Sequence, residues 1–205
     1  MKNNRAIVLW TGGKDCNLAL HEARLKGFEI VRLITFSIDE KEMKAHPTEI
    51  MKTQAKSLGI PYEIIPLQKP FEKSYEEALI NLKNNFDVET IVTGDIAEVM
   101  QQPNWITLRC KAVGLNAFLP LWQLDREEIL LKLIDYNFNV IISYAKEPWF
   151  TEKWIGRKIT HELIQELKEL HQLNGVDICG ENGEYHTIVI DGPDYQYSVG
   201  DLKIC

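Results

Sequence analysis

The sequence has few of the features that mark secreted, membrane-bound or disulfide-rich proteins. Its four cysteines (Cys16, Cys110, Cys179 and Cys205) lie far apart and form no Cys-x-x-Cys pair. Such spacing is typical of reduced thiols and argues against a disulfide framework. No apolar run approaches the roughly 20 residues that span a bilayer, and the apolar stretch 6–10 is too short for the core of a signal peptide. We therefore expect a cytoplasmic protein without a membrane anchor.

Positive charge is also scarce. The 205 residues carry 23 Lys and Arg against 30 Asp and Glu, which gives a net charge of -7. An acidic chain has no general attraction for nucleic acid, so no RNA partner is expected. With 45% hydrophobic and 26% charged residues, the composition is that of an ordinary globular protein. This length suffices for one large domain or for a medium domain with a smaller one.

Apolar strands and amphipathic helices alternate along the first 122 residues. We expect strands at 6–10, 29–36, 62–67, 89–93 and 117–122, and helices at 14–26, 48–58, 72–84 and 104–113. This alternation is typical of an α/β fold, in which right-handed helical crossovers cover both faces of a parallel sheet.

The pattern changes after residue 122. The capping-box sequence at 125–128 predicts a helix to about Tyr136, followed by a strand at 139–144 and a helix at about 157–173. The aromatic residues of the loop at 149–154 are expected to pack a second core. We therefore predict a first domain at 1–122 and a smaller domain at 123–205.

A glycine turn follows the first strand. The run Thr11-Gly12-Gly13-Lys14-Asp15-Cys16 leads directly into the first helix. Glycines let backbone N–H groups approach an anion closely, and the dipole of the following helix favours phosphate there. Lys14 adds positive charge, and Asp15 in the first helical turn would contact Mg²⁺ or cap the helix. The turn matches neither GxxxxGK[ST] nor GxGxxG, the two commoner phosphate loops.

Other strand ends are expected to line the same site, because ligands of open parallel sheets bind beyond the carboxyl ends of the strands. Ser37 and Asp39 follow the second strand, and Gly94 and Asp95 follow the fourth. In a sheet of order 3-2-1-4-5 the fourth strand neighbours the first. Asp95 would then join Asp15 in holding a Mg²⁺ ion.

The turn resembles the PP-loop of the adenine nucleotide alpha hydrolase superfamily, whose members bind ATP there and cleave between its α and β phosphates. Four motifs in order narrow the resemblance: TGGKDC at 11–16, VTGDI at 92–96, LPLW at 119–122 and CGENGEYHTIVIDGP at 179–193. Together they resemble the diphthine–ammonia ligase family over nearly the whole chain. The last motif is similar to that family's G-E-x-G-E-[FY]-x-T signature.

The resemblance implies a HUP-type, Rossmann-like sheet of five parallel strands in the order 3-2-1-4-5, followed by a smaller α/β domain. It also implies an ATP-dependent ligase that uses Mg²⁺: a substrate carboxylate attacks ATP, pyrophosphate leaves, and ammonia displaces AMP to form an amide. Lys14, Asp15, Glu181 and Glu184 are the expected catalytic residues. The signature residues expected to bind substrate are Gly180, Glu181, Gly183, Glu184, Tyr185, His186 and Thr187.

The sequence departs from the family pattern in the glycine turn and on the substrate side. Thr11 and Cys16 stand where serine is more usual, and both are small polar replacements that should affect nucleotide binding little. Segment 95–105 lacks an expected serine- and arginine-containing stretch, and His186 replaces an acidic residue. The acceptor carboxylate is therefore either that of modified elongation factor 2 or that of a small molecule. The size and the aromatic content are compatible with a homodimer.

Three other interpretations stay open. Glu181, Glu184 and His186 would suit a metal, although the segment lacks a fourth ligand. A tRNA-thiolating PP-loop enzyme would need a persulfide cysteine, for which Cys110 and Cys179 are the candidates. A non-catalytic nucleotide-binding module related to universal stress proteins shares the broader fold but lacks both the GGKD turn and the acidic motif.

Overall fold

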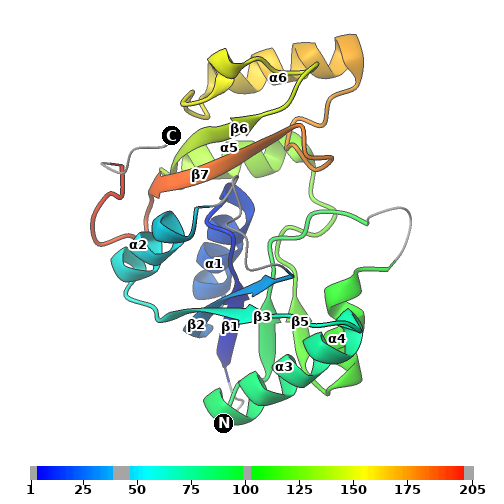
Figure 1. Ribbon diagram of the computed structural model, residues 1–205. Coiled ribbons are helices and arrows are strands. Elements are labelled where there is room, and N and C mark those ends of the chain that lie inside the picture. Colours follow the sequence, from blue (N-terminus) through cyan, green and yellow to red (C-terminus); the bar gives the residue numbers. More distant parts are fainter. Residues whose placement is uncertain (1–3, 39–46, 99–102, 201–205) are drawn as a thin grey trace. The chain divides into compact units, whose positions relative to one another are not determined.

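The structure is a computed structural model that describes residues 4–38, 47–98 and 103–200 (Figure 1). The chain divides into two compact units. Unit 1 comprises Met1–Thr11, Asp15–Glu42 and Gly59–Gln123, and unit 2 comprises Gly12–Lys14, Met43–Leu58 and Leu124–Cys205. The glycine turn and the helix at 48–58 are thus grouped with the C-terminal segment. The domain boundary at residue 122 stays a prediction.

Unit 1 contains a parallel sheet of five strands. Its strands are β1 (Arg5–Leu9), β2 (Glu29–Ser37), β3 (Tyr62–Pro66), β4 (Thr90–Val92) and β5 (Asn116–Phe118), in the order β3-β2-β1-β4-β5. Its helices are α1 (Lys14–Leu25), α3 (Phe71–Phe86) and α4 (Trp105–Ala112). The predicted fold class and strand order are therefore confirmed.

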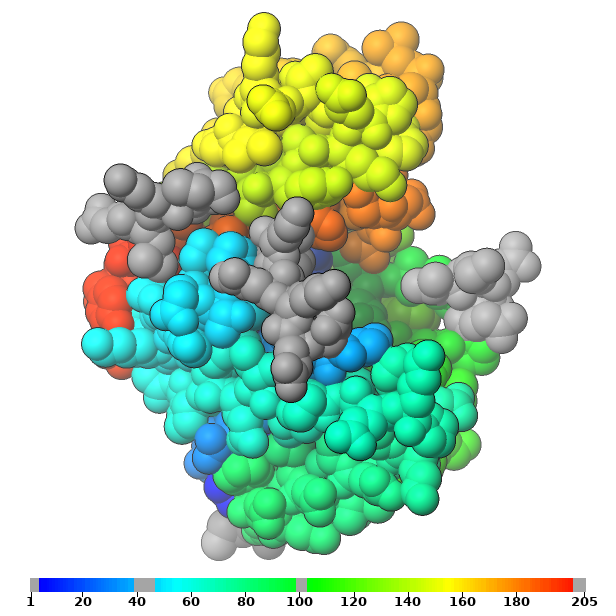
Figure 2. All heavy atoms as spheres, viewed as in Figure 1, coloured from blue at the N-terminus to red at the C-terminus, as the bar shows by residue number. Residues whose placement is uncertain are grey.

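The crossovers explain how the helices are distributed. The chain moves from β1 toward one edge through α1, then back across the sheet through α3 and onward through α4. Right-handed crossovers in opposite directions place α1 on one face and α3 with α4 on the other. Residues Tyr75, Leu79 and Leu82 of α3 and Cys110 of α4 form one buried core with Ile7, Ile34 and Ile91 of the strands. Figure 2 shows the atoms of α3 forming the visible surface of unit 1 over this face.

The strand order reverses between β1 and β4, which pair side by side from Ala6↔Thr90 to Val8↔Val92. Such a reversal opens a crevice at the carboxyl ends of the two strands, where doubly wound folds bind their ligands. The two segments that leave these ends are the glycine turn after β1 and Gly94-Asp95 after β4. Within unit 1, the topology therefore places Gly94 and Asp95 after the carboxyl end of a strand that borders the reversal.

Unit 2 is built around two antiparallel strands, β6 (Asn139–Ala145) and β7 (Tyr185–Asp191). Its helices are α2 (Thr48–Leu58), α5 (Arg126–Asp135), the short η1 (Glu152–Trp154) and α6 (His161–Asn174). The predicted helix start is confirmed, because Asp125 is the N-cap and its side chain accepts hydrogen bonds from the N–H groups of Glu127 and Glu128. β7, which runs beside β6 in Figure 1, was not predicted.

The predicted start of the last helix at 157 is wrong. Helix α6 begins at His161, because Thr160 caps it by accepting a hydrogen bond from Leu163 N. The preceding residues are extended instead: Lys158 forms a bridge with Ile141, and Ile142 N donates to Arg157 O at 2.9 Å. The expected aromatic core is confirmed, since Phe150 is buried and its ring meets those of Trp154 and Tyr185 edge-on at 4.8 and 5.6 Å. Among the described residues, no helix is long and apolar enough to cross a membrane.

Candidate functional site

The glycine turn has the backbone conformation that its sequence indicates. Gly12 adopts φ +76°, which is the left-handed region that favours glycine. A Cβ at Gly12 would also lie 2.5 Å from Gln54 Oε1. Helix α1 begins at Lys14 and places Asp15 in its first turn. Thr11 Oγ1 donates to Cys16 Sγ at 3.6 Å, so the two small polar residues at the ends of the turn contact each other.

Residues 12–14 are held by hydrogen bonds to other parts of unit 2. Val189 N donates to Gly12 O at 3.2 Å, and Lys14 N donates to Thr187 Oγ1 at 3.1 Å. The side chain of Gln54, on α2, is fully buried and donates from Nε2 to both Gly12 O (2.9 Å) and Val189 O (2.7 Å). Both Gly12 and Lys14 are therefore hydrogen-bonded to β7, and Gln54 binds the turn and β7 at the same time.

Of the predicted strand-end residues of unit 1, Gly94 lies against the first turn of α1. A Cβ at Gly94 would lie 2.6 Å from the carbonyl carbon of Asp15, so only glycine allows β4 to approach α1 this closely. The neighbouring Asp95 accepts hydrogen bonds from Thr93 Oγ1 at 3.0 Å and from Asn104 Nδ2 at 2.5 Å. Ser37 ends β2, and its carbonyl accepts from Leu67 N at 2.7 Å. Asp39 lies outside the described residues.

This arrangement suits a magnesium ion held mainly by phosphate oxygens. Asp15 and Asp95 supply carboxylates, the hard oxygen ligands that Mg²⁺ prefers, and Gly94 brings the two segments within van der Waals contact. Within the described part of the chain, no cluster of three His, Cys, Asp or Glu side chains suitable for a metal occurs. Mg²⁺ in nucleotide sites needs only one or two protein carboxylates. The residues therefore fit Mg²⁺ bound with ATP, and a site formed by Glu181, Glu184 and His186 is not supported.

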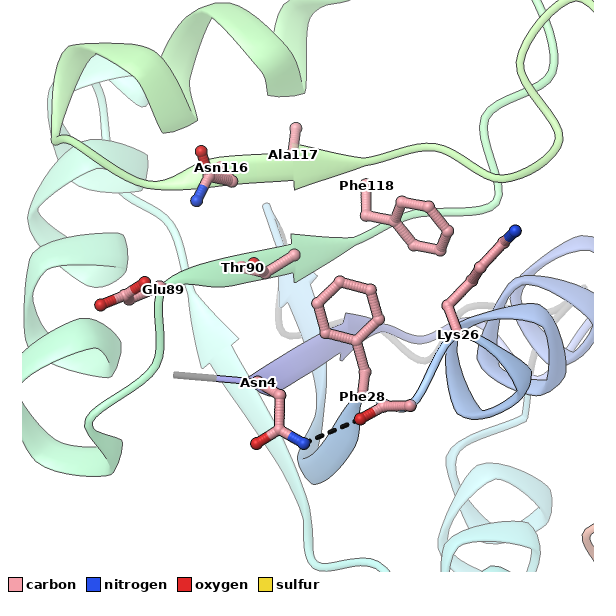
Figure 3. A pocket seen from close by; sticks show the side chains of 9 residues that line it. Asn4, Lys26, Phe28, Glu89, Thr90, Asn116, Ala117 and Phe118 are labelled. Carbon is pink, nitrogen blue, oxygen red and sulfur yellow. Dashed lines mark hydrogen bonds between the residues drawn. The ribbon is translucent and has the colours of Figure 1, made fainter. Parts of the chain in front are cut away.

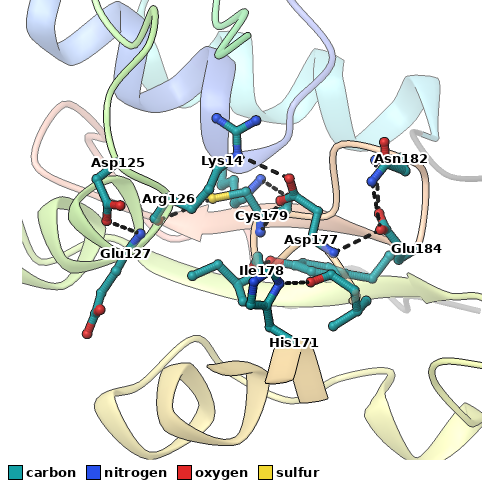
Figure 4. Close-up of polar contacts among 12 residues, drawn as sticks. Lys14, Asp125, Arg126, Glu127, His171, Asp177, Ile178, Cys179, Asn182 and Glu184 are labelled. Carbon is teal, nitrogen blue, oxygen red and sulfur yellow. Dashed lines mark hydrogen bonds and ion pairs between the residues drawn. The ribbon is translucent and has the colours of Figure 1, made fainter. Parts of the chain in front are cut away.

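Lys14 is buried, with 3% of its surface exposed. Its ammonium donates to Cys179 O at 2.7 Å and lies 5.8 Å from the centroid of the Tyr185 ring. A buried ammonium is costly unless hydrogen bonds replace its hydration, which the carbonyl of Cys179 does in part. The Lys14 ammonium is thus held by the residue just before the GENGEYHT segment, as Figure 4 shows.

The loop before β7 is organised by Glu184. Although only 2% of its surface is exposed, its carboxylate accepts hydrogen bonds from Asp177 N and Asn182 N, both at 2.9 Å, and from Asn182 Nδ2 at 3.0 Å. All of these donors belong to the loop itself. Glu181, by contrast, is exposed. The two carboxylates of the motif therefore lie in different environments, which the sequence did not distinguish.

This contrast predicts different effects on stability. In Glu184→Gln the amide nitrogen would face N–H donors, so we expect the free energy of unfolding to fall by about 1.5–3 kcal/mol, the range for a hydrogen bond to a charged group. The matched change Glu181→Gln should leave it within about 0.5 kcal/mol, as is usual for surface substitutions. Urea denaturation of both variants measures the difference. Equal stabilities would show that the loop does not depend on the Glu184 carboxylate.

The other signature residues shape the same loop and strand. Gly180 and Gly183 adopt φ +76° and +78°, and a Cβ at Gly180 would lie 2.7 Å from Tyr185 O. The buried Tyr185 donates from its hydroxyl to Ile178 O at 2.6 Å. Thr187, also buried, is the residue whose hydroxyl oxygen accepts from Lys14 N.

His186 is half-buried on β7, where its ring lies 5.3 Å from that of Tyr144. Burial lowers the pKa of His186, and the positive charge of Lys14 lowers it further. The folded state thus binds a proton at His186 less readily than the unfolded chain does. His186 should therefore be neutral at pH 7.

The lowered pKa has a defined effect on stability. Its contribution is fully present above the unfolded value of about 6.5, and it is lost as pH falls from there through the folded pKa. Between pH 7.5 and pH 5, the free energy of unfolding should therefore fall more in the wild type than in His186→Gln. Denaturation midpoints at these two pH values measure the difference. Parallel losses in the two proteins would contradict the assignment.

One cavity lies away from these residues. It has a volume of about 390 Å³ and is lined by Asn4, Lys26, Gly27, Phe28, Glu89, Thr90, Asn116, Ala117 and Phe118 (Figure 3). Thr90 and Asn116 are the first residues of β4 and β5, so this cavity opens at the amino ends of the strands. Open parallel sheets bind ligands at the opposite edge, and we assign this cavity no part in the site.

Comparison with known proteins decides the family. A model described as the diphthamide synthase N-terminal domain matches residues 4–117, and one described as the diphthamide synthase C-terminal domain matches residues 125–202. The chain belongs to the diphthamide synthase family.

Several diphthamide synthase relatives carry the name diphthine–ammonia ligase. The mouse protein is 24% identical over 220 residues, which cover 95% of this chain and 82% of the mouse protein. The Saccharomyces cerevisiae protein is 28% identical over 237 residues, covering 96% of this chain but 34% of the yeast protein. The Schizosaccharomyces pombe protein is 32% identical over 112 residues, covering 55% of this chain. The chain matches only 18% of the length of that last protein.

A solved structure resembles the fold of this diphthamide synthase family member. It is a Methanocaldococcus jannaschii protein described as a predicted subunit of tRNA methyltransferase, with a TM-score of 0.51 and 14% identity. The match covers 92% of this chain and 97% of that one. At this level of identity the likeness concerns the fold alone.

Sequence reasoning missed three residues that contact the glycine turn or the loop before β7: Gln54, Arg126 and Asp177. Gln54 lies on a helix that the sequence analysis predicted without singling out any of its side chains. Arg126 was considered only as part of a capping box, and Asp177 lies just before the GENGEYHT motif. A signal for Gln54 exists in its spacing, because Ile50, Met51, Gln54 and Leu58 form one buried face of α2.

The buried cysteines bear on the chemistry open to the diphthamide synthase chain. Cys110 is fully buried in the core of unit 1, and burial raises its pKa to about 11. Cys179 is 2% exposed, and its thiol donates to Arg126 O at 3.3 Å. A reactive cysteine needs exposure, which neither of these has, and thiolate character, which the raised pKa of Cys110 also opposes.

Proposed function

We propose that this chain is an ATP-dependent ligase that adenylates a substrate carboxylate and then amidates it with ammonia. The observation that carries the proposal is the match of both diphthamide synthase domain models in order, together with relatives named diphthine–ammonia ligase that align over 95% of the chain. In the proposed reaction a carboxylate oxygen attacks the α phosphorus of ATP and pyrophosphate leaves. Ammonia then attacks the acyl carbon, AMP leaves, and a proton is lost from nitrogen.

The glycine turn would bind the phosphates. Gly12 and Gly13 leave the backbone open to an anion, and the N-terminus of α1 adds its partial positive charge. The Lys14 ammonium stabilises negative charge that grows on the pyrophosphate as it leaves. Its hydrogen bond to Cys179 O restricts its position, so little reorganisation is needed during the reaction.

Asp15 and Asp95 would hold Mg²⁺ beside these phosphates. The ion supplies neutralisation of phosphate charge when bound. Thr93 and Asn104 orient the Asp95 carboxylate through their hydrogen bonds to its two oxygens. We propose that Ser37 contacts the nucleoside of ATP.

On the acceptor side, we propose that Glu181 orients the incoming ammonia or a cationic part of the substrate, because its carboxylate is exposed. Glu184 acts through the loop that it holds together. A neutral His186 could take up the proton that the ammonia nitrogen loses when the amide forms. The differences from the family pattern at 95–105 and at His186 leave two candidates for the carboxylate substrate: a diphthine-bearing elongation factor or a small molecule.

Thiolation of tRNA and simple nucleotide binding are less well supported. The first needs a persulfide cysteine, and Cys110 and Cys179 are both buried. A protein that only binds a nucleotide would have no use for the GENGEYHT loop. A cytoplasmic location and a homodimer remain part of the proposal.

The test mixes the purified protein with MgATP and ammonium, and supplies either diphthine-bearing elongation factor or a metabolite extract. We expect AMP and pyrophosphate in equal amounts, dependent on one of the two acceptors and absent in Gly13→Val. Production of ADP, or no nucleotide cleavage with either acceptor, would contradict the ligase proposal.

A further inference from the structure

The carbonyl that holds Lys14 belongs to a tight turn at residues 177–180. Gly180 N donates to Asp177 O at 2.9 Å, which closes the turn. The Asp177 side chain supports the turn from within, because its Oδ1 accepts from Cys179 N at 2.7 Å. This Asx arrangement is the usual way in which an aspartate fixes the two residues that follow it. The Cys179 carbonyl is thereby directed at the Lys14 ammonium.

Asp177 is bound at every one of its polar groups. Its Oδ2 accepts from Arg126 Nε at 3.1 Å, and its backbone N–H donates to Glu184 Oε1 at 2.9 Å. Arg126 also accepts, through its backbone carbonyl, the thiol hydrogen of Cys179. Arg126, the first residue of α5, therefore contacts the turn twice, once at Asp177 and once at Cys179. Figure 4 shows these contacts together with Lys14.

The ion pair is partly shielded from water. The Arg126 and Asp177 side chains are 27% and 17% exposed. Burial alone would lower the pKa of Arg126, but the hydrogen bond and the negative charge of Asp177 raise it above its ordinary value. Shielded pairs are screened by salt less than exposed pairs are. Arg126 therefore restrains Asp177 more firmly than a surface cation would.

We propose that Asp177, held by Arg126, is a positioning residue that sets the location of the Lys14 ammonium through the Cys179 carbonyl. The proposal rests on the proposed function, in which Lys14 meets the phosphates of ATP. Asp177 acts on Lys14 without touching the substrate. Its effect passes through one peptide group, so its loss should displace the ammonium without removing it.

The first measurement compares kcat for AMP formation in Asp177→Ala and Asp177→Asn. Alanine removes the support of the turn, and displacing a catalytic group by about 1 Å can lower a rate by roughly 100-fold. We expect a loss of that order in kcat per folded molecule, with the KM for ammonia unchanged. Asparagine keeps an oxygen for Cys179 N and loses the charge that pairs with Arg126, so its loss should be smaller.

The second measurement does not depend on activity. The Tyr185 ring lies 5.8 Å from Lys14 Nζ, so its ring current should shift the Lys14 Cε–H NMR signal. With ¹³C-labelled lysine, and with Lys14→Arg to assign the peak, we expect a displaced signal in the wild type. That signal should move toward the position of exposed lysines in Asp177→Ala and in Arg126→Gln.

The matched control is another Arg–carboxylate pair of the same unit. Arg157 and Glu166 form two hydrogen bonds of 2.9 and 2.6 Å outside this loop. Glu166→Gln should leave both the Lys14 signal and kcat unchanged. Thermal unfolding of every variant gives the folded fraction by which kcat is corrected.

The outcomes separate the two proposals. If the wild type forms no AMP, the proposed ligase function fails, while the Lys14 signal still tests the positioning role. A Lys14 signal that moves in Asp177→Ala and Arg126→Gln but not in Glu166→Gln supports that role. An unchanged Lys14 signal in Asp177→Ala, or a kcat loss fully explained by unfolded protein, overturns it.

Discussion

Lys14→Met is expected to reduce AMP formation by about 100- to 1,000-fold, the usual cost of removing a donor aimed at developing negative charge. Methionine keeps the length and the apolar stem of the side chain but removes the ammonium beside the glycine turn. The effect should fall mainly on kcat, because charge on the leaving pyrophosphate grows during the reaction.

The same substitution should affect stability much less. It removes the hydrogen bond to Cys179 O, and a hydrogen bond to a charged group contributes about 1.5–3 kcal/mol. It also removes a buried charge, which works in the opposite direction. Lys14→Arg should retain part of the activity, because the guanidinium keeps the positive charge but differs in shape from the ammonium.

Lys153→Met is the control for the change in net charge, since Lys153 is an exposed residue of η1. Steady-state assays of the three variants, with folding checked by circular dichroism, decide the matter. Activity of Lys14→Met within a factor of about three of the wild type would remove Lys14 from the phosphate chemistry, since far larger losses follow when such a donor is removed.

Gly94→Ala should have the second large effect. The added methyl group would lie 2.6 Å from the carbonyl carbon of Asp15, 2.7 Å from its oxygen and 2.8 Å from Cys16 N. All three are backbone atoms, so no side-chain rotation relieves the contact. The end of β4 and the start of α1 must separate, which moves Asp15 relative to Asp95.

We expect Gly94→Ala to lower the free energy of unfolding by about 1–3 kcal/mol, as overpacking usually does. Weaker binding of MgATP should accompany this loss, measured by calorimetry on protein that is still folded. Gly200→Ala is the matched control, because its nearest neighbours are the flexible Ser198 Oγ at 3.3 Å and Ile190 Cδ1 at 3.6 Å. Equal binding of MgATP by the two variants would show that the approach of β4 to α1 does not shape the site.

The sequence predicted the sheet of unit 1 well because each of its strands is a compact apolar run followed by clear helix and turn signals. The parallel order followed from those alternations and from the resemblance. β7 was missed because its residues were interpreted as a functional motif, although TIVI at 187–190 is a run of β-branched residues of the kind that favours a strand. The start of α6 was misplaced because Arg157-Lys158-Ile159 continue the helical pattern, whereas Thr160 provides the actual cap.

The candidate site was predictable where it depends on local chemistry and not where it depends on distant contacts. Glycines, Lys14 and the strand-end aspartates indicate a phosphate site through their spacing. Nothing local shows that Glu184 is buried while Glu181 is exposed, because both stand beside glycine in a polar loop. Likewise, the tie from Gln54 to Gly12 and Val189 joins residues 42 and 135 positions apart.

The hydrogen bonds of residues 12–14 also set the order of events during synthesis. Val189 and Thr187, which bind Gly12 and Lys14, are synthesised more than 170 residues after them. Chains emerge from the N-terminus, and earlier segments fold first where they can. The glycine turn therefore acquires these hydrogen bonds only after β7 has emerged, so chains that end before β7 lack the contacts that hold residues 12–14.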